Sequence, residues 1–371
     1  MSLVLYRKYR PQKFSEFIGQ EHIVKTLTNA ISNGMISHAY LFSGPRGSGK
    51  TTLARLLAKA INCQNRKDGE FEPCNKCSSC IEITESRSID LIEIDAASHR
   101  GIDDIRELRD GIRFAPTKSK YKVFIIDESH QLTKEAANAL LKTLEEPPEH
   151  AIFILATTEI HKMIPTILSR CQRFDFRKLT LPEITKKLKI ISEKEKIKIE
   201  KAALELIALN SEGSMRDAES VLDQVFTFYG ASKNEIKIDD IKDLLGLVDI
   251  ELVSKFTEFL CQKKAIQAIN FLNEVSEKGL DLEEFARTLI KYLRQGLILK
   301  IMGEAKHRPT WFLGGLTREE IKKLREQINC FKEEDLKKIL TLFLEAENKM
   351  KYSPIPQLPL ELAIVESCGV V

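Results

Sequence analysis

The chain has 371 residues, 43% of them hydrophobic and 30% charged, and a formal net charge of +3. This length predicts about two or three domains, and the composition excludes a disordered or fibrous chain. The nearly balanced charge restricts any nucleic-acid contact to a local patch. No apolar run approaches the roughly 20 residues of a membrane span. At the N-terminus the apolar residues precede the basic ones, the reverse of a secretory signal, so we expect a cytoplasmic protein without membrane contact.

A helical pattern over 23–31 leads to a short apolar strand over 39–42 and then to a glycine-rich loop. The loop fits G-x-x-x-x-G-K-[ST], and apolar residues recur at helical spacing over 53–61 after it. Glycines let backbone amides curl around a triphosphate, and the helix N-terminus adds a positive dipole. A turn that fits by chance would lack these flanks. We therefore predict a nucleotide site formed by Gly44, Pro45, Arg46, Gly47, Ser48, Gly49, Lys50, Thr51 and Thr52, with Lys50 on the β/γ oxygens and Thr51 on Mg²⁺.

Four of the eight cysteines are clustered, at Cys63, Cys74, Cys77 and Cys80. Two C-x₂-C steps and a thiol upstream predict a structural zinc site with four thiolate ligands, in a module over about 63–80. The alternatives are free thiols on a loop or a redox pair, and the second lacks a thioredoxin-type strand before it. We expect the other four cysteines to be isolated and packed without disulfides: Cys171, Cys261, Cys330 and Cys368.

Further apolar runs alternate with helical patterns up to residue 178, which predicts a parallel sheet with right-handed crossovers. In chain order these elements are a strand over 90–95, an amphipathic helix over 102–113, a buried strand over 121–126, a helix over 133–145 that stops at two prolines, a buried strand over 151–156 and a weaker strand over 172–176.

The strand over 121–126 ends in two acids, Asp127 and Glu128. Ligands of open α/β sheets bind at the carboxyl edge of the strands, so both acids are expected beside the P-loop. Asp127 would hold Mg²⁺, and Glu128 would orient and deprotonate the attacking water. Two surface acids at the end of a strand would be the ordinary interpretation in a chain without a P-loop.

Strand-like runs vanish after residue 178, and helical periodicity continues to the C-terminus. We predict three domains: an α/β core over 1–178, a helical domain over 179–243 and an all-α domain over 244–371.

Together these motifs resemble AAA+ ATPases of the clamp-loader type, and in particular the bacterial DNA polymerase III gamma/tau family. The resemblance is dense over residues 1–225 and loose afterwards. It rests on the P-loop, the cysteine insert and the stretches Tyr9–Pro11, Ile18–His22, Glu93–Ser98, Asp127–His130, Leu140–Pro148, Leu155–Thr158, Ser169–Cys171 and Gly213–Ala218.

The resemblance implies an AAA+ core, a helical lid and an ATP-hydrolysing site. Thr158 would be a sensor at the end of its strand that contacts the γ-phosphate or its water, and a strand-end hydrogen bond is the alternative. Arg170 resembles an arginine finger that reaches a neighbouring subunit, and otherwise would be a solvated charge. Arg216 resembles a second sensor from the lid, and otherwise would pair with Asp217 or Glu219. The residues that would line the adenine are Tyr6, Arg10, Pro11, Ile18 and Gly19.

The family also implies partners: other clamp-loader subunits in a ring-like pentamer, a sliding clamp and primer–template DNA. The helices after about residue 244 would form the oligomerising collar. Arg106, Lys142 and Lys162 resemble positions that face DNA, although each is equally well explained as a charge on a solvated helix face.

Four functions are open to a chain with these motifs: an ATP-hydrolysing motor, a nucleotide-binding scaffold, a branch-migration helicase and a polymerase. The intact Lys50, Thr51, Asp127 and Glu128 favour an ATP-hydrolysing motor over a nucleotide-binding scaffold with negligible turnover. The cysteine cluster argues against a branch-migration helicase. Polymerase activity is rejected for this chain, because no second set of carboxylates forms a two-metal site.

Overall fold

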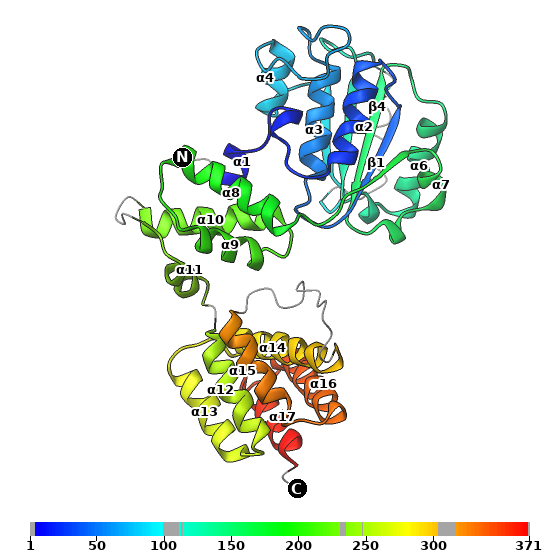
Figure 1. The fold of residues 1–371 in the computed structure, drawn as a ribbon. Coiled ribbons are helices and arrows are strands. Elements are labelled where there is room, and N and C mark those ends of the chain that lie inside the picture. Colours follow the sequence, from blue (N-terminus) through cyan, green and yellow to red (C-terminus); the bar gives the residue numbers. More distant parts are fainter. Residues whose placement is uncertain are drawn as a thin grey trace. The chain divides into compact units, whose positions relative to one another are not determined.

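The computed structural model describes residues 4–98, 111–112, 114–230, 235–246, 248–302 and 317–369. The chain falls into two compact units, Met1–Glu235 and Ile236–Val371, each with its own apolar core (Figure 1). The predicted boundary at residue 243 lies inside helix α11 (Ile238–Leu245), whereas the two compact units meet between Glu235 and Ile236.

The first unit contains a parallel five-stranded sheet in the order β2-β3-β4-β1-β5, as the alternation of strands and helices predicts. Its register aligns Asp95 with Asp127 and Ser43 with Thr157, so the carboxyl ends of four strands meet at one edge. The strands are β1 (Ala39–Ser43), β2 (Leu91–Asp95), β3 (Lys122–Asp127), β4 (Ala151–Thr157) and β5 (Gln172–Asp175).

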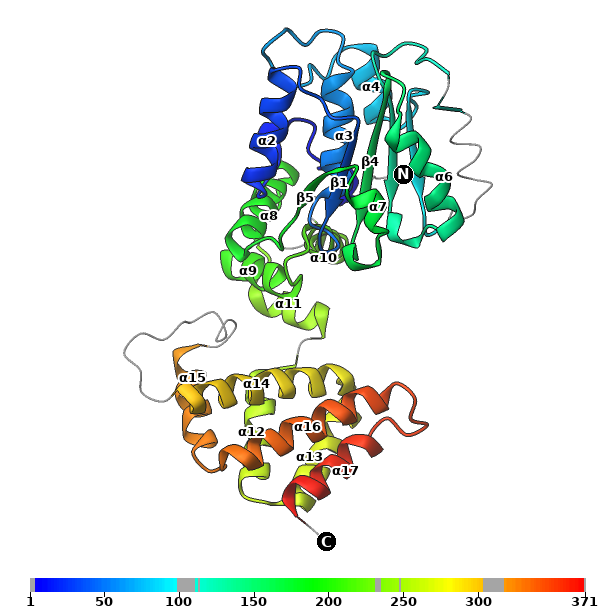
Figure 2. The same ribbon diagram turned by 90° about the vertical axis from the view of Figure 1, so that its right-hand side faces the viewer.

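Helices cover both faces of this sheet, which explains why β1 and β4 are buried along their whole length (Figure 2). Tyr40 and Phe42 pack on the face covered by α2 and α3, and Leu41 packs on the face covered by α6 and α7. The helices of this core are α1 (Leu5–Lys8), α2 (Glu21–Ser32), α3 (Lys50–Ile61), α4 (Ser78–Thr84), α6 (Lys134–Glu145) and α7 (Pro165–Leu168), with short 3₁₀ turns at Phe14–Glu16, Ser129–Gln131 and Ile160–Lys162.

Three helices, α8 (Leu181–Glu195), α9 (Lys201–Asn210) and α10 (Met215–Tyr229), form a lid in the same unit. The first begins with a capping box, in which Glu183 accepts from the backbone amide of Thr180 at 2.7 Å. The last is capped by Ser214, whose hydroxyl oxygen accepts from the Asp217 amide at 3.3 Å. These caps fix where the lid helices begin relative to the sheet edge.

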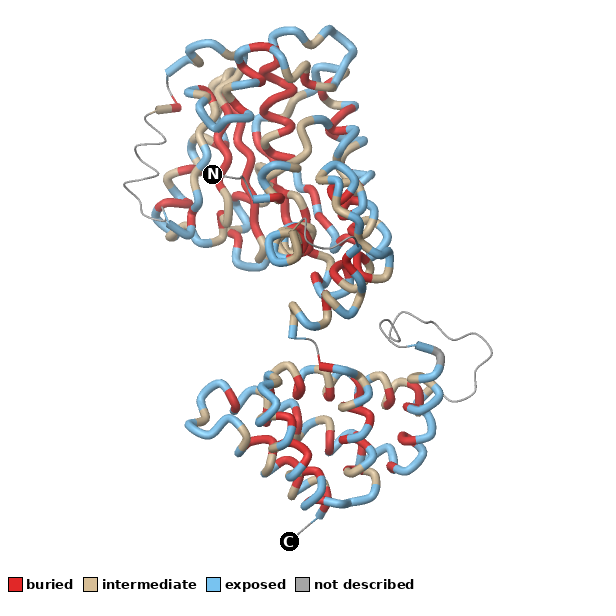
Figure 3. Tube along the Cα trace, turned by 90° about the vertical axis from the view of Figure 1, so that its left-hand side faces the viewer, coloured by how far each residue is buried: buried red, intermediate tan, exposed pale blue. Residues whose placement is uncertain are grey.

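The regular elements in the described part of the second unit are all helices, and the buried residues lie on their inward faces (Figure 3). The buried apolar residues among them form its core. Phe256 lies at the centre of its core, with Phe285 and Phe343 packed edge-on against its ring. Besides α11 the helices are α12 (Ile250–Cys261), α13 (Ala265–Glu277), α14 (Leu282–Met302), α15 (Arg318–Ile328), α16 (Glu333–Met350) and α17 (Leu358–Cys368). None of the described helices in either unit has the length and apolar character needed to cross a membrane.

The prediction of four isolated cysteines is wrong for one pair. Cys261 and Cys330 form a disulfide that links positions 69 residues apart, with their Cα atoms separated by 5.8 Å. Packing of α12 against α15 brings Cys261 at the end of α12 beside the turn after α15. Spacing along the chain gives no sign of such a contact. Cys368 is a free buried thiol, and Cys171 is a free, partly buried one whose pKa burial raises to about 12.

Candidate functional site

The P-loop connects β1 to α3 and requires glycine at its turns. Gly49 is the residue before α3 and has φ +101°, in the left-handed region where side chains are strained. A Cβ at this position would lie 2.6 Å from the ring of Phe17. The loop therefore lines the cavity on one side, and the Phe17 ring packs closely against it at Gly49.

Lys50 begins α3, and only 5% of its surface is exposed. Its ammonium donates to the carbonyl oxygens of Gly44 at 2.8 Å and Pro45 at 2.9 Å. Burial lowers the pKa of Lys50, and the carboxylates of Glu128 and Asp127 oppose this shift. A positive charge is thus held inside the loop, where it can serve an anionic ligand.

The two acids lie across the sheet edge from this lysine. Thr51 donates its hydroxyl to Oδ2 of Asp127 at 2.7 Å, and Thr158 donates to Oε2 of Glu128 at 2.9 Å. Glu128 leaves β3 with φ +46°, which turns its side chain away from the strand direction. A hydroxyl and a carboxylate beside a triphosphate are ligands that Mg²⁺ accepts, so Thr51 and Asp127 fit a magnesium site.

A cavity of about 1060 Å³ opens along this edge, between the P-loop, the N-terminal segment and the lid. It is large enough for a nucleoside triphosphate. The predicted site residues that line it are Tyr6, Arg10, Pro11, Ile18, Arg46, Gly47, Ser48, Gly49, Lys50, Thr51, Thr52, Asp127, Glu128 and Arg216. Those that lie outside its lining are Gly19, Gly44, Pro45, Thr158 and Arg170.

The lid contacts the P-loop directly. The amide of Met215, the first residue of α10, donates to the Gly47 carbonyl at 3.2 Å. Next to it, the guanidinium carbon of Arg216 lies 5.0 Å from the ring centroid of Tyr6. Within the described residues Arg216 forms no ion pair with Asp217 or Glu219. The start of α10 thus brings a cation to the cavity.

Two buried charges in the lid line the cavity although the sequence did not predict either as a site residue. Lys187 of α8 is 9% exposed, and its ammonium donates to the Tyr9 carbonyl at 2.9 Å. Glu219 of α10 is 6% exposed; burial raises its pKa to about 7, and Lys187 and Arg10 oppose the rise. Both residues line the cavity. The sequence does carry a signal for each, a charged residue within the apolar stripe of a helix. Lys187 lies between Ile184 and Ile191 on α8, and Glu219 follows Ala218 on α10.

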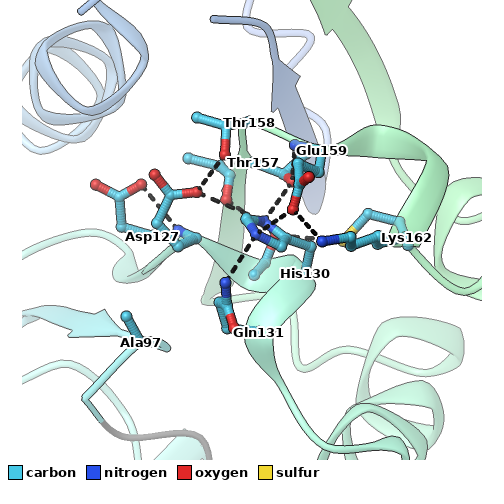
Figure 4. Close-up of polar contacts among 12 residues, drawn as sticks. Ala97, Asp127, His130, Gln131, Thr157, Thr158, Glu159 and Lys162 are labelled. Carbon is cyan, nitrogen blue, oxygen red and sulfur yellow. Dashed lines mark hydrogen bonds and ion pairs between the residues drawn. The ribbon is translucent and has the colours of Figure 1, made fainter. Parts of the chain in front are cut away.

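The buried side chain of His130 also connects Glu128 to Glu159, which follows β4 (Figure 4). Nδ1 of His130 lies 2.9 Å from the Thr157 hydroxyl and 3.5 Å from Oε2 of Glu128. Its Nε2 lies 3.2 Å from Oε2 of Glu159, which accepts from Lys162 at 2.6 Å. The contacts fix the imidazole between two carboxylates.

Arg170, Lys142 and Lys162 lie outside the lining of the cavity. Arg170 is paired with Glu145 and donates to the Thr166 carbonyl at 2.7 Å. Lys142 is exposed on α6, and Lys162 is exposed apart from its ion pair with Glu159. Arg106 lies outside the described residues, as does nearly all of the helix predicted over 102–113.

The four clustered cysteines converge. Their sulfur atoms all lie within 4.8 Å of one another, and Cys80 is fully buried. Backbone amides of Lys76 and Cys77 donate to the Cys74 sulfur at 3.4 and 3.3 Å, and these donors help to lower its pKa to about 6 against the effect of burial. Tetrahedral zinc bonded at 2.3 Å separates its sulfurs by about 3.8 Å, so the group is compatible with zinc.

The sheet order, the P-loop after β1, the acids after β3 and the helical lid define an AAA+ P-loop ATPase fold. Family patterns match three successive stretches: "DNA polymerase III, delta subunit" over residues 19–180, "DNA polymerase III clamp loader subunit, ATPase lid domain" over 183–230, and "DNA polymerase III subunits gamma and tau domain III" over 236–370.

Curated relatives agree with these patterns. DNA polymerase III subunit tau of Bacillus subtilis is 43% identical over 98% of this chain and 63% of its own length. DNA polymerase III subunit gamma of Buchnera aphidicola is 35% identical over 98% of this chain and 97% of its own length. The chain belongs to the DNA polymerase III gamma/tau family. It spans 63% of the Bacillus subtilis protein and 55% of the tau subunit of Escherichia coli, to which it is 36% identical.

Solved structures are more remote. The RuvB Holliday junction branch migration motor of Thermotoga maritima is 21% identical, with a TM-score of 0.48 over 74% of this chain and 86% of its own. The DNA clamp loader delta protein of Bacillus subtilis is 17% identical, with a TM-score of 0.39 over 93% of this chain and 99% of its own.

Proposed function

We propose that this chain is an ATP-hydrolysing motor subunit of a clamp loader, which loads a sliding clamp onto primer–template DNA during replication. Its membership of the gamma/tau family supports the assembly, and the geometry of the sheet edge supports the chemistry. The observation that carries the proposal is that Lys50 and Thr51, at the start of α3, and Asp127 and Glu128, at the end of β3, line one cavity.

The P-loop amides, Lys50 and the α3 dipole bind the triphosphate. The adenine end lies against the N-terminal segment, where Tyr6, Arg10, Pro11 and Ile18 line the cavity. Thr51 and Asp127 hold magnesium, which when bound neutralises charge on the phosphate oxygens. The four cysteines hold a structural zinc ion.

Glu128 is the general base of the hydrolytic step. Its carboxylate takes a proton from the water that attacks the γ-phosphorus, while the bond from that phosphorus to the bridging oxygen of ADP breaks. The Thr158 hydroxyl holds one oxygen of this carboxylate at 2.9 Å and keeps it at the sheet edge. Arg216 neutralises phosphate charge from the lid of the same subunit.

Arg170 acts on a neighbouring subunit in this proposal. It lies outside the lining of its own cavity and, two residues after α7, donates to the Thr166 carbonyl, which supports a role at a neighbouring site. Loss of the γ-phosphate would then weaken both the lid contact and the subunit interface. The assembly is a ring-like pentamer of clamp-loader subunits in the cytoplasm, with the helices of the second unit as its collar and Arg106, Lys142 and Lys162 as candidate DNA contacts.

The test is the ATP turnover rate of the assembled complex, with and without clamp and primed DNA. We expect clamp and DNA to raise the rate, and Glu128→Gln to lower it by at least ~10² while ATP still binds. A wild-type rate indistinguishable from that of Glu128→Gln under all conditions would instead identify a nucleotide-binding scaffold.

A further inference from the structure

The segment Gln12–Phe17 contributes to the lining of the nucleotide cavity and is hydrogen-bonded to Glu72 of the cysteine module and to Lys59 of α3. We propose that metal binding by the cysteine module and nucleotide binding at the P-loop are thermodynamically coupled through this segment, so that each raises the affinity for the other. The inference rests on the proposed nucleotide site and adds a regulatory role for the metal module.

Glu72 makes the first connection. It lies two residues before Cys74, and its two carboxylate oxygens accept from the amides of Phe14 at 2.9 Å and Ser15 at 2.8 Å. These amides begin the 3₁₀ turn Phe14–Glu16, so one carboxylate accepts from the N–H groups of two successive peptide units. Phe14 is 2% exposed, and its ring meets that of Phe71 edge-on at 6.3 Å between centroids. The cysteine module therefore fixes the position of this turn.

Lys59 makes the second connection. It lies on α3, the helix that begins at the P-loop, and is 3% exposed. Its ammonium donates to the side-chain oxygens of Gln12 and Thr84, each at 2.6 Å. Thr84 belongs to α4 and donates to the carbonyl of Cys80 at 2.8 Å. A buried ammonium with two fixed acceptors thus ties a metal-ligand helix to both the P-loop helix and the N-terminal segment.

On the other side the segment forms part of the cavity wall. The Gln12 amide group donates to the Arg10 carbonyl at 3.1 Å, and Arg10 and Phe17 line the cavity. The Phe17 ring packs so closely on Gly49 that a Cβ added there would lie only 2.6 Å from the ring carbon Cζ. A shift of residues 12–17 therefore moves side chains that contact the nucleotide loop.

The module depends on its sulfur cluster for a core. The buried residues of this cluster are Cys63, Cys77 and Cys80, with Cys74 packed against them. Metal–thiolate bonds therefore supply much of the free energy that orders the module, and with it Glu72 and α4. Coupling between two binding sites is reciprocal, so nucleotide must raise metal affinity by the same factor.

The test uses the full chain loaded with zinc and a fluorescent ATP analogue with magnesium. We expect chelation of zinc to weaken analogue binding about five- to tenfold. The same analogue at saturation should raise zinc affinity, measured in competition with a chromogenic chelator, by the same factor. Circular dichroism checks that the sheet unit stays folded. Equal analogue affinity with and without zinc would overturn the inference. Absence of analogue binding by the zinc-loaded chain would instead overturn the proposed nucleotide site.

Two variants distinguish the loss of the Glu72 hydrogen bonds from a general disturbance of the cysteine module. Glu72→Ala should keep its zinc, bind the analogue more weakly and show a reduced response to chelation. The control is Glu70→Ala, because the exposed Glu70 side chain has no hydrogen bond or ion pair among the described residues. Full coupling in Glu72→Ala, or the same loss in Glu70→Ala, would contradict the assigned route.

Discussion

Glu219 is a carboxyl group in an apolar position of the lid, 6% exposed and in the field of Lys187 and Arg10. Burial raises its folded-state pKa from 4.5 to about 7, so between these values the folded protein binds more protons than the unfolded chain. Stability of the first unit should therefore fall by about 1.4 kcal/mol per pH unit as pH rises from about 4.5 to 7, and level off above 7.

Glu219→Gln should remove this dependence. The stability difference between the variant and the wild type, from urea unfolding of the first unit at several pH values, should grow in favour of the variant between pH 5 and 7. A difference that does not change with pH would show that Glu219 stays ionised in the folded protein.

Arg170→Ala tests the finger in trans. The residue does not line its own cavity, so the variant should keep wild-type ATP affinity. In the assembled complex turnover should fall by about 10³ or more, the usual effect of losing such a guanidinium. Arg173→Ala is the control, because Arg173 is nearby on β5 and pairs with Asp175 at 2.8 Å. Unchanged turnover for Arg170→Ala in the complex would remove the assignment.

At the scale of elements, the contact between the P-loop and the start of α10 leaves no room for a side chain. Gly47 has φ +72°, and a Cβ there would lie 2.0 Å from the Ser214 hydroxyl that caps α10. Gly47→Ala should therefore displace the lid, lower stability by about 1–2 kcal/mol and weaken ATP binding at least tenfold.

Gly34→Ala is the matched control. Gly34 also has a positive φ, +69°, but a Cβ there meets nothing within 4 Å. This variant carries the backbone strain without the clash, so it should lose stability and keep its ATP affinity, both measurable by titration and thermal unfolding. Equal losses of affinity in the two variants would mean that the lid contact contributes nothing to binding.

The elements of the core could be predicted because each signal is local. The predicted strand over 151–156 corresponds to β4 (Ala151–Thr157), and the helix over 133–145 corresponds to α6 (Lys134–Glu145). A continuous apolar run or a helical stripe ending at proline lies within a few residues and needs no tertiary information. The P-loop and the acids after β3 are predictable for the same reason.

The rest of the site depends on contacts between distant residues. Lys59 acquires its role only when Gln12 and Thr84 approach it, and Glu72 only when it reaches the amides of Phe14 and Ser15. No spacing rule encodes these contacts. The disulfide between Cys261 and Cys330 was missed for the same reason, since 69 residues separate its ends.

At the scale of the whole molecule, the two units have separate apolar cores. Calorimetry should resolve two unfolding transitions. ATP analogue and magnesium at about one hundred times Kd should stabilise the transition of Met1–Glu235 by about 2.7 kcal/mol and leave that of Ile236–Val371 unchanged. A single transition, or an equal shift of both, would show that the units unfold together.

The central claim is that a nucleoside triphosphate binds at the loop between β1 and α3, held by a buried lysine. Titration calorimetry with a non-hydrolysable ATP analogue and magnesium, on the wild type and Lys50→Ala, tests it most directly. We predict one analogue bound per wild-type chain and at least a hundredfold weaker binding by the variant, because the loop loses the charge that Lys50 places 2.8 Å from the Gly44 carbonyl. Equal affinity of the two proteins, or no binding by either, would contradict the account.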